Sequence, residues 1–255
     1  MTDTFIDVDD LEWKTAKINR YIQEGPIEKH KYRFELELFE PYASWDALDM
    51  WEDERLESMQ KHIKQGDVLF EVGAEMGLFP AIFSKYMTEN VVLIEPTAEF
   101  WPGIKAIFQK NKLKDPIVSF CGFADDTSQT WEQSFGWPVE VHSGKVIEKR
   151  KYRNLFDKDD LRDIPAIQLD KISANCDAIS IDVEGAELHV LRGATHLLSS
   201  HRPKVWVSVH PDMMERDYGH TKADLLFFMD AQDYEAELLA VDHEEHWLFL
   251  PKETK

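Results

Sequence analysis

The sequence predicts an α/β protein built on an open, mostly parallel β-sheet with helices on both faces. From residue 67 onward, short apolar runs alternate with longer segments of helical periodicity, the order expected of repeated strand–helix units. The runs are almost continuously apolar, as strands are when both faces of a sheet are covered. A glycine turn joins the first run to a helical segment and completes the strand–turn–helix pattern.

Seven segments have the length and composition of strands, and they span residues 67–72, 91–95, 116–121, 178–183, 203–209, 234–240 and 246–250. Helical segments fall near residues 77–88, 98–112, 186–199 and 221–231. Only residues 241–245 join the last two strands. Because a parallel crossover needs a dozen or more residues, these two strands must run antiparallel.

Two regions lie outside this alternation. Residues 1–60 are polar and rich in aromatic side chains, and we predict a mostly helical N-terminal extension that caps the substrate. Its clearest helical periodicity runs from Trp45 to Ile63. An insert over about residues 128–156 breaks the pattern, and short alternating runs around Ser143-Gly144 predict a hairpin within it. Residues 61–255 form the main domain.

The 255 residues are 43% hydrophobic and carry a net charge of −20. No apolar run approaches the ~20 residues of a membrane span, and the acidic N-terminus lacks the features of a signal peptide. Cys121 and Cys176 lie in strand-like segments and are expected to be reduced thiols, which favours a cytoplasmic location. The negative charge disfavours nucleic acids and anionic membranes as partners.

One basic strip departs from this charge. It consists of Lys145, Lys149, Arg150, Lys151 and Arg153, which lie within nine residues. Such a strip suits an anionic substrate group, although a solvated hairpin explains it more simply.

The turn after the first strand has the chemistry of a nucleoside site. Gly73 and Gly77 let a ligand approach the backbone, because glycine lacks the Cβ that would block it. Glu71 and Glu75 would repel a pyrophosphate but suit a cation. Glu95 ends the next strand, at the sheet edge where ligands bind, and a carboxylate can accept both hydroxyls of a ribose. S-adenosylmethionine carries both a cation and a ribose; the alternative is a plain turn with solvated acids.

A second polar group follows the strand at 178–183. Asp182 and Glu184 share one side of the strand end, because side chains alternate with a period of two. One of them is suited to the cofactor or a metal, and the other to orienting or deprotonating a hydroxyl. Gly185 begins a helix, and we expect Glu187 to cap it.

Several stretches closely resemble the FkbM-type methyltransferases, which depend on S-adenosylmethionine. Residues 181–194 read IDVEGAELHVLRGA and carry the most specific part of the likeness. Residues 71–77 read EVGAEMG and are followed by LIEP at 93–96. Residues 164–170 look like the segment before the family's fourth strand, and Trp51-Glu52 looks like its acid-bearing helix.

This resemblance implies a Rossmann-like class I methyltransferase fold, with a seven-stranded, mostly parallel sheet whose last strand is antiparallel. It implies O-methyl transfer to a hydroxyl of a sugar, a glycan or a small secondary metabolite. The cofactor-binding residues that it implies are Glu71, Gly73, Ala74, Gly77, Glu95, Ala124, Asp125 and Asp182. Asp182 and Glu184 would face the methyl-transfer centre.

The chain departs from the family pattern at several positions. Glu71 and Glu75 stand where Asp and Asn are common. Ser180 stands where the family often has a lysine, and Ser208 where it often has a glutamate. The joint loss of these two charges is consistent with a compensated swap of a buried ion pair.

His210 ends the strand at 203–209 and is the first candidate for the general base, because a neutral imidazole accepts a proton near pH 7. Asp182 is the second candidate, and Asp212 and Glu184 are expected to orient the imidazole. A strand-end histidine without chemistry is the alternative. These residues offer ligands to a divalent metal, but their spacing does not require one.

His243 and His246, with two acids between them, suggest a zinc site. We interpret them instead as a solvated turn between strands.

Three other functions remain open. A nicotinamide-dependent oxidoreductase is disfavoured by the missing third glycine and the acidic loop. A non-catalytic binding module would keep the fold without the chemistry. A nucleic-acid methyltransferase is disfavoured by the charge and by the lack of a motif for a flipped base. The expected partner is a small-molecule or glycan acceptor, and the sequence does not decide between a monomer and a homodimer.

Overall fold

The computed structural model describes residues 11–24, 27–39, 52–127, 134–138 and 164–253. The expected hairpin around Ser143-Gly144 and the basic strip lie outside these residues. No helix in this part of the chain combines the length and the apolar character that crossing a bilayer requires.

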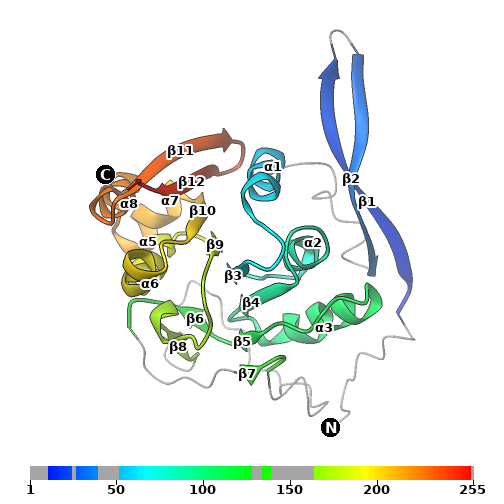
Figure 1. Ribbon diagram of the computed structural model, residues 1–255, viewed down its shortest axis with the longest axis horizontal. Helices are drawn as coiled ribbons and strands as arrows, with labels where there is room; N and C mark the ends of the chain where they lie inside the picture. Colours follow the sequence, from blue (N-terminus) through cyan, green and yellow to red (C-terminus); the bar gives the residue numbers. More distant parts are fainter. Residues whose placement is uncertain (1–10, 25–26, 40–51, 128–133, 139–163, 254–255) are drawn as a thin grey trace.

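An eight-stranded sheet forms the centre of the molecule, in the order β11-β12-β10-β9-β3-β4-β5-β7 (Figure 1). Its strands are β3 (Val68–Val72), β4 (Asn90–Ile94), β5 (Val118–Phe120), β7 (Ser134–Phe135), β9 (Ala178–Asp182), β10 (Lys204–Val209), β11 (Tyr234–Val241) and β12 (Glu245–Pro251). The seven predicted strands are all present. β3, β4, β5, β9 and β10 are parallel, and β12 runs antiparallel to both of its neighbours, as predicted. The short β7 was not predicted and pairs antiparallel with β5.

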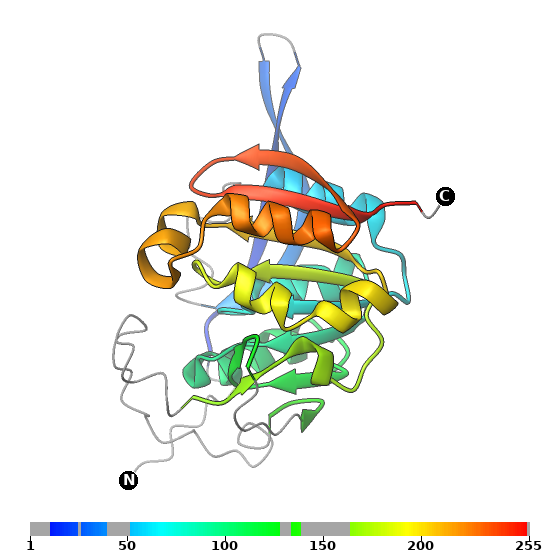
Figure 2. The same cartoon turned by 90° about the vertical axis from the view of Figure 1, so that its left-hand side faces the viewer.

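Helices cover the sheet on two sides (Figures 1 and 2). One side carries α1 (Asp53–His62), α2 (Leu78–Tyr86), η4 (Ala98–Phe100) and α3 (Trp101–Lys110). The other carries α5 (Glu187–Arg192), α6 (Thr195–Ser200), α7 (Pro211–Met213), η7 (Met214–Tyr218) and α8 (Lys222–Ala231). Two minor elements, β6 (Phe123–Ala124) paired with β8 (Ala166–Ile167) and the turn η6 (Leu169–Lys171), lie beside β5.

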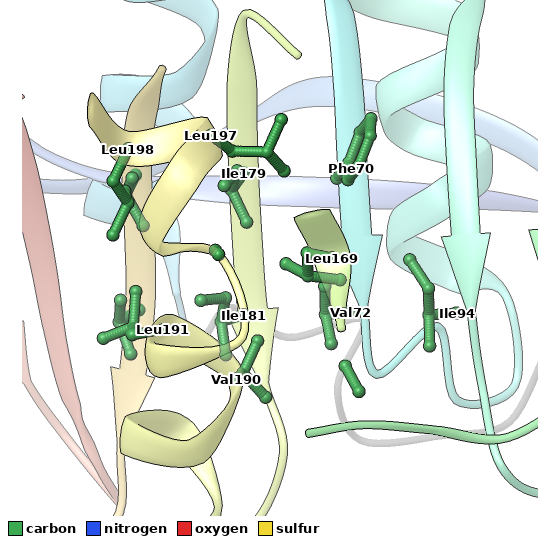
Figure 3. Packing of buried hydrophobic residues seen from close by; sticks show 14 of the residues in the cluster. Phe70, Val72, Ile94, Leu169, Ile179, Ile181, Val190, Leu191, Leu197 and Leu198 are labelled. Atoms are coloured by element: carbon green, nitrogen blue, oxygen red, sulfur yellow. The ribbon is translucent and has the colours of Figure 1, made fainter. Parts of the chain in front are cut away.

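Two hydrophobic cores lie on the two faces of the sheet. Leu69 belongs to the core under α1, α2 and α3, whereas its neighbours Phe70 and Val72 belong to the core under α5, α6 and α8. In Figure 3, Val72 lies between Ile94 and Ile181, Leu197 of α6 packs beside Ile179 of β9, and Leu191 and Leu198 lie over the neighbouring strand β10. Because consecutive strand residues point to opposite faces, a continuously apolar strand is needed to fill both cores.

The prediction of a helical N-terminal extension is wrong for most of the described part of it. β1 (Trp13–Glu24) and β2 (Ile27–Phe39) form an antiparallel hairpin that projects beyond the body of the molecule (Figure 1). The sequence carried a signal for this: from Phe34 to Phe39 apolar residues alternate with Glu35 and Glu37, which is the period of a strand. Only α1, inside the predicted helix 45–63, is helical as expected.

The base of the hairpin is fixed to the domain through the edge of β2. The Tyr86 hydroxyl accepts from the Glu35 backbone N–H at 2.8 Å. The Asn111 amide pairs with the Glu37 backbone, accepting from its N–H at 2.9 Å and donating to its carbonyl at 2.8 Å. These side chains satisfy backbone groups that an edge strand would otherwise leave exposed. The base of the hairpin is therefore part of the fold.

The turns after β3 and β9 touch at the carboxyl edge of the sheet. Gly73 has a φ of +92°, and a Cβ placed on it would lie 1.8 Å from the Asp182 carbonyl oxygen. Its N–H donates to the Ile94 carbonyl at 3.0 Å, which also ties it to β4. Only glycine fits this position, because both the space and the backbone angle exclude a side chain.

We therefore predict that Gly73→Ala destabilises the protein far more than Gly66→Ala. Gly66 has a similar φ of +97°, but a Cβ placed on it would meet no atom of the described residues within 4 Å. The control should lose only the ~1–2 kcal/mol of a left-handed alanine. Gly73→Ala should lose at least about 2 kcal/mol more from the clash. Equal losses in the free energy of unfolding, measured by urea denaturation, would contradict this account.

Candidate functional site

A cavity of about 1100 Å³ opens along the carboxyl ends of β3, β4, β5, β9 and β10, and the turn between β11 and β12 closes one end of it. Eight predicted site residues line it: Glu71, Gly73, Glu95, Ala124, Asp125, Asp182, Glu184 and His210. Ala74 and Gly77 lie behind the wall. Ala74 is buried, and Gly77 begins α2 against Ile104 with a φ of +91°. The structure thus gathers residues from five strand ends into one space.

Glu95 forms the wall of the cavity after β4. Its carboxylate is buried and accepts the Thr97 N–H at 2.7 Å on one oxygen and the Glu75 N–H at 2.8 Å on the other. Burial raises its pKa, and these hydrogen bonds oppose the rise. The Thr97 side chain also donates to this carboxylate, so the carboxylate is held in place in the cavity wall.

Asp125 lies at the far end, after β6. Its backbone N–H donates to the Ile167 carbonyl at 3.0 Å, and a Cβ on Gly193 would lie 2.1 Å from its carbonyl oxygen. Burial and the neighbouring Asp126 raise the pKa of its carboxyl group. The imidazole of His189 lies 3.7 Å from it. The backbone here is closely packed, so the side chain has a defined position.

The two acids of the β3 turn have different environments. Glu71 is 1% exposed, and burial raises its pKa to about 8 despite the opposing effects of Arg55 and Ser180. Glu75 lies in the mouth of the cavity with a φ of +45°. Desolvation and then the neighbouring carboxylates of Glu95 and Glu184 raise its pKa to about 7. Both carboxyl groups would be stabilised in the charged form by a cation in the cavity.

Arg55 supplies a buried positive charge that the sequence analysis missed. Its guanidinium is 1% exposed and pairs with Glu52, donates to the Ser180 hydroxyl at 2.5 Å, and lies 3.8 Å from Asp182. Arg55 therefore places a cation beside Ser180, where the family often has a lysine. Its signal was a charged residue on the apolar face of α1, next to Leu56 and Met59.

His210 does not have the neutral imidazole that we expected. Its Nδ1 lies 2.8 Å from Glu187, and its Nε2 lies 2.6 Å from Glu244. Although burial lowers the pKa, the hydrogen bonds to both carboxylates and the nearby Asp182 raise it to about 11. A protonated ring with both nitrogens engaged is a poor base near neutral pH. Glu187 and Glu244 also take the orienting role that we expected of Asp212 and Glu184.

Glu187 also accepts the Gly185 N–H at 2.9 Å. The expected cap is not formed, because α5 begins at Glu187 after the N-cap Ala186 and has no side-chain cap hydrogen bond. One oxygen of Glu187 joins the Gly185 N–H to His210. The other oxygen, Oε2, is buried without a hydrogen-bond partner among the described residues.

Asp182 and Glu184 face the cavity beside His210. Asp182 lies 3.9 Å and Glu184 3.8 Å from Nε2 of the imidazole, and both distances exceed a direct hydrogen bond. Burial, Glu244 and Glu52 raise the pKa of Asp182 well above its usual range, against the effects of Arg55 and His210. The Glu184 side chain is 65% exposed, so it lies at the mouth rather than in the wall.

The turn with His243 and His246 is not solvated throughout, so that interpretation is wrong for its second half. His246 is 0% exposed and Glu244 is 4% exposed. Nε2 of His246 lies 3.1 Å from Asp242, and its Nδ1 lies 3.2 Å from the Ser208 hydroxyl. The antiparallel return of β12 turns these polar groups inward, against α1 and the end of β10.

Residues 71–252 match the family model of the methyltransferase FkbM domain. The chain belongs to the FkbM methyltransferase family. The match covers every strand end that lines the cavity, but not the hairpin β1–β2 or α1. No curated protein matches the chain.

Several solved methyltransferases are similar in structure. The FkbM methyltransferase of Methylobacillus flagellatus is 20% identical, with 72% of this chain and 43% of that chain covered and a TM-score of 0.47. A precorrin-6y C5,15-methyltransferase of Geobacter metallireducens is 11% identical, with 79% and 88% covered and a TM-score of 0.46. TYW2 of M. jannaschii, in complex with AdoMet, is 14% identical, with 92% and 87% covered and a TM-score of 0.41. This chain spans less than half of the M. flagellatus protein.

FkbM methyltransferases depend on S-adenosylmethionine, and the cavity has features that fit this group. The fixed carboxylate of Glu95 in the cavity wall suits ribose hydroxyls. Burial is the main cause of the raised pKa values of Glu71 and Glu75, and a sulfonium and an ammonium would stabilise their charged forms.

Arg55→Met should destabilise this FkbM protein by about 3–5 kcal/mol, because it leaves buried carboxylates without their cation. The exposed pair Arg216–Asp217 gives a control, and Arg216→Met should change the free energy of unfolding far less than Arg55→Met. A lysine on β9 should replace the lost charge, so Arg55→Met with Ser180→Lys should recover much of the loss. Urea denaturation measures all three variants, and no recovery in the double variant would refute the swap of charges.

The pH dependence of His210 provides a separate test. Folding raises its pKa from 6.5 to about 11, so its stabilising contribution is complete below about pH 6.5 and is lost as the pH rises toward 11. We expect both ring nitrogens to remain protonated at pH 9, as read from their ¹⁵N chemical shifts. His62, whose pKa is lowered by burial and nearby lysines, should lose its proton first. A neutral His210 at pH 8 would restore the base assignment.

Proposed function

We propose that the chain transfers the methyl group of S-adenosylmethionine to a hydroxyl of a sugar, a glycan or a small secondary metabolite. The observation that carries this proposal is the position of Asp182. It faces the same cavity as Glu95, with β3 lying between their two strands, and lies 3.8–3.9 Å from two positive groups. One cavity thus holds a candidate nucleoside site and a candidate proton acceptor.

The cofactor residues are assigned along the sheet edge. Glu95 would hold the ribose, and Ala124 and Asp125 would border the adenine. Glu71 and the turn at Gly73 would lie beside the methionine portion. Ala74 and Gly77 shape this turn from behind, since neither lines the cavity.

When bound, S-adenosylmethionine supplies a methyl group on a positively charged sulfur. The task of this chain is to hold the acceptor oxygen in line with that group and to exclude water. Between its two polar ends the cavity has an apolar wall, which includes Val72, Ile94 and Phe79. Such a wall excludes water without competing for hydrogen bonds.

Asp182 is our choice for the residue that takes the hydroxyl proton. Its raised pKa makes its carboxylate a stronger base than an exposed aspartate. His210, as an imidazolium, stabilises the charged form of this carboxylate from 3.9 Å and is a positioning residue. Glu184, at the mouth, would orient the acceptor.

The polarity of the acceptor end supports a polyhydroxylated substrate. Asp182, Glu184, Glu244 and Glu52 all line this end, and carboxylates accept hydrogen bonds from hydroxyls. A purely apolar acceptor would desolvate these acids further without offering them hydrogen bonds, which is costly. We therefore favour a sugar or glycan over an apolar metabolite.

Methyl-labelled S-adenosylmethionine tests this proposal against a panel of free sugars, oligosaccharides, small hydroxylated metabolites and RNA. We expect label in a hydroxylated acceptor as an O-methyl ether. Asp182→Asn should lower kcat by roughly 10²–10⁴-fold and leave cofactor affinity nearly unchanged. Glu95→Ala should weaken S-adenosylhomocysteine binding by roughly 10- to 100-fold in calorimetry, since it removes charge-assisted hydrogen bonds.

Glu235→Ala, on the exposed face of β11, is the matched control and should bind the cofactor product normally. Label found only in RNA would show that the acceptor is a nucleic acid and not a sugar, a glycan or a small metabolite. Binding of NAD without binding of S-adenosylhomocysteine would overturn the enzymatic proposal itself.

A further inference from the structure

The turn between β11 and β12 brings metal-ligating side chains together outside the proposed transfer centre. Glu52, Glu244 and His246 each offer one ligand atom, and these atoms lie within 4.8 Å of one another. Asp242 adds a carboxylate 3.1 Å from Nε2 of His246, and its Oδ2 accepts from the Glu52 N–H at 3.4 Å. The start of α1 and the turn therefore form one cluster, although they are far apart in sequence.

The three central members of this cluster are buried. Their exposed fractions are 3% for Glu52, 4% for Glu244 and 0% for His246. Charged side chains are almost never buried to this degree unless they are paired or bind a metal ion. Glu52 has Arg55 on one side, but the turn itself contributes no lysine or arginine.

One carboxylate oxygen in the cluster has no hydrogen-bond donor. Oε1 of Glu244 is buried without a hydrogen-bond partner among the described residues. Nε2 of His243 lies 3.2 Å from it and Nε2 of His246 lies 3.8 Å from it, yet neither places a proton in line with it. The other oxygen of Glu244 is already committed to His210 at 2.6 Å. A buried lone pair that faces imidazole nitrogens in this way is typical of a ligand set.

The charge around the cluster is also unbalanced. Arg55 and His210 lie against Glu52 and Glu244, and they also serve Asp182 and Glu187. Glu52 and Glu244 therefore share these cations with other acids, whereas the ion-pair partners of Asp242 among the described residues are imidazoles, His243 at 2.9 Å and His246 at 3.1 Å. An additional cation would stabilise this arrangement.

We propose that Glu52, Glu244 and His246, with Asp242 beside them, bind one divalent transition-metal ion. Metal–ligand bonds of ~2.1 Å place two donors at most ~4.2 Å apart, and the three ligand atoms of the cluster already lie within 4.8 Å of one another. One imidazole with carboxylates favours ions such as Mn²⁺ or Zn²⁺ over Mg²⁺ and Ca²⁺, which prefer oxygen ligands alone.

The ion lies one carboxylate away from the candidate transfer centre. Glu52 and Glu244 both line the cavity, and Glu244 bridges the metal through Oε1 and His210 through Oε2. This site differs from the neighbouring set Asp182, Glu184 and His210, because Nε2 of that histidine is engaged by Glu244. The ion would fix the turn that closes the acceptor end of the cavity.

Equilibrium dialysis of the chelator-treated full chain against Mn²⁺ or Zn²⁺, with the metal counted by mass spectrometry, tests the proposal. We expect one equivalent, and at least a 10-fold loss of affinity in Glu244→Gln and His246→Gln. Glu245→Gln is the matched control. Glu245 is adjacent to Glu244 but pairs with Lys222 at 2.7 Å, so this variant should bind the metal normally. Pulsed EPR of bound Mn²⁺ should show coupling to an imidazole nitrogen that disappears in His246→Gln.

If His246→Gln fails to fold, Glu52→Gln gives the same test from the start of α1. No binding above the level of Glu245→Gln, or binding that is unchanged in Glu244→Gln, would overturn the proposal. Loss in Glu184→Gln with retention in Glu244→Gln would move the ion to the other cluster and would also refute this site. None of these measurements uses cofactor or acceptor, so the site is tested separately from the methyl transfer.

Discussion

The structure of the site depends on the burial of one guanidinium. Arg55 reaches from α1 across the end of β3 and neutralises acids that come from α1 and β9. Removing one partner from a buried charge cluster is strongly destabilising, whereas an intact cluster contributes little net stability. Its effect is therefore on geometry: α1 can dock only where Glu52 and Asp182 both meet the guanidinium. That position places Glu52 and Asp182 together in the lining of the cavity.

The excess of acids over bases then determines what the cavity accepts. Glu71 and Glu75 have pKa values raised to about 8 and about 7, so each is partly protonated at neutral pH. A cation that enters the cavity favours their ionised forms, and its binding is coupled to proton release. An anionic ligand would instead favour the protonated forms of Glu71 and Glu75. The same loop that excludes a pyrophosphate thus favours a sulfonium or an ammonium, without any direct contact being required of Glu75.

The parallel strands, their helices and the residues at their carboxyl ends could be predicted from the sequence, because apolar runs and glycine turns are local signals. The hairpin β1–β2 was missed because residues 1–60 were predicted as one mostly helical extension, although Phe34 to Phe39 alternates with period two. The protonation of His210 could not be predicted at all. It depends on Glu187 from α5 and Glu244 from the last turn, which meet only in the folded chain. The sequence pattern within one element indicates where its residues lie, but the pKa of a side chain depends on partners from several elements.

The two serines at family positions show how this chain has redistributed charge. Ser180 on β9 now accepts a hydrogen bond from Arg55 of α1, and Ser208 on β10 lies 3.2 Å from His246 of β12. The small hydroxyl side chains of Ser180 and Ser208 leave room for the larger side chains of Arg55 and His246. Because a buried charge requires a partner, moving the cation to α1 and placing an imidazole on β12 also brings Glu52 and Glu244 to the cavity wall. The acceptor end is therefore shaped by the start of α1 and the β11–β12 turn as well as by the ends of β9 and β10. Differences in acceptor choice among related chains should follow the first two elements.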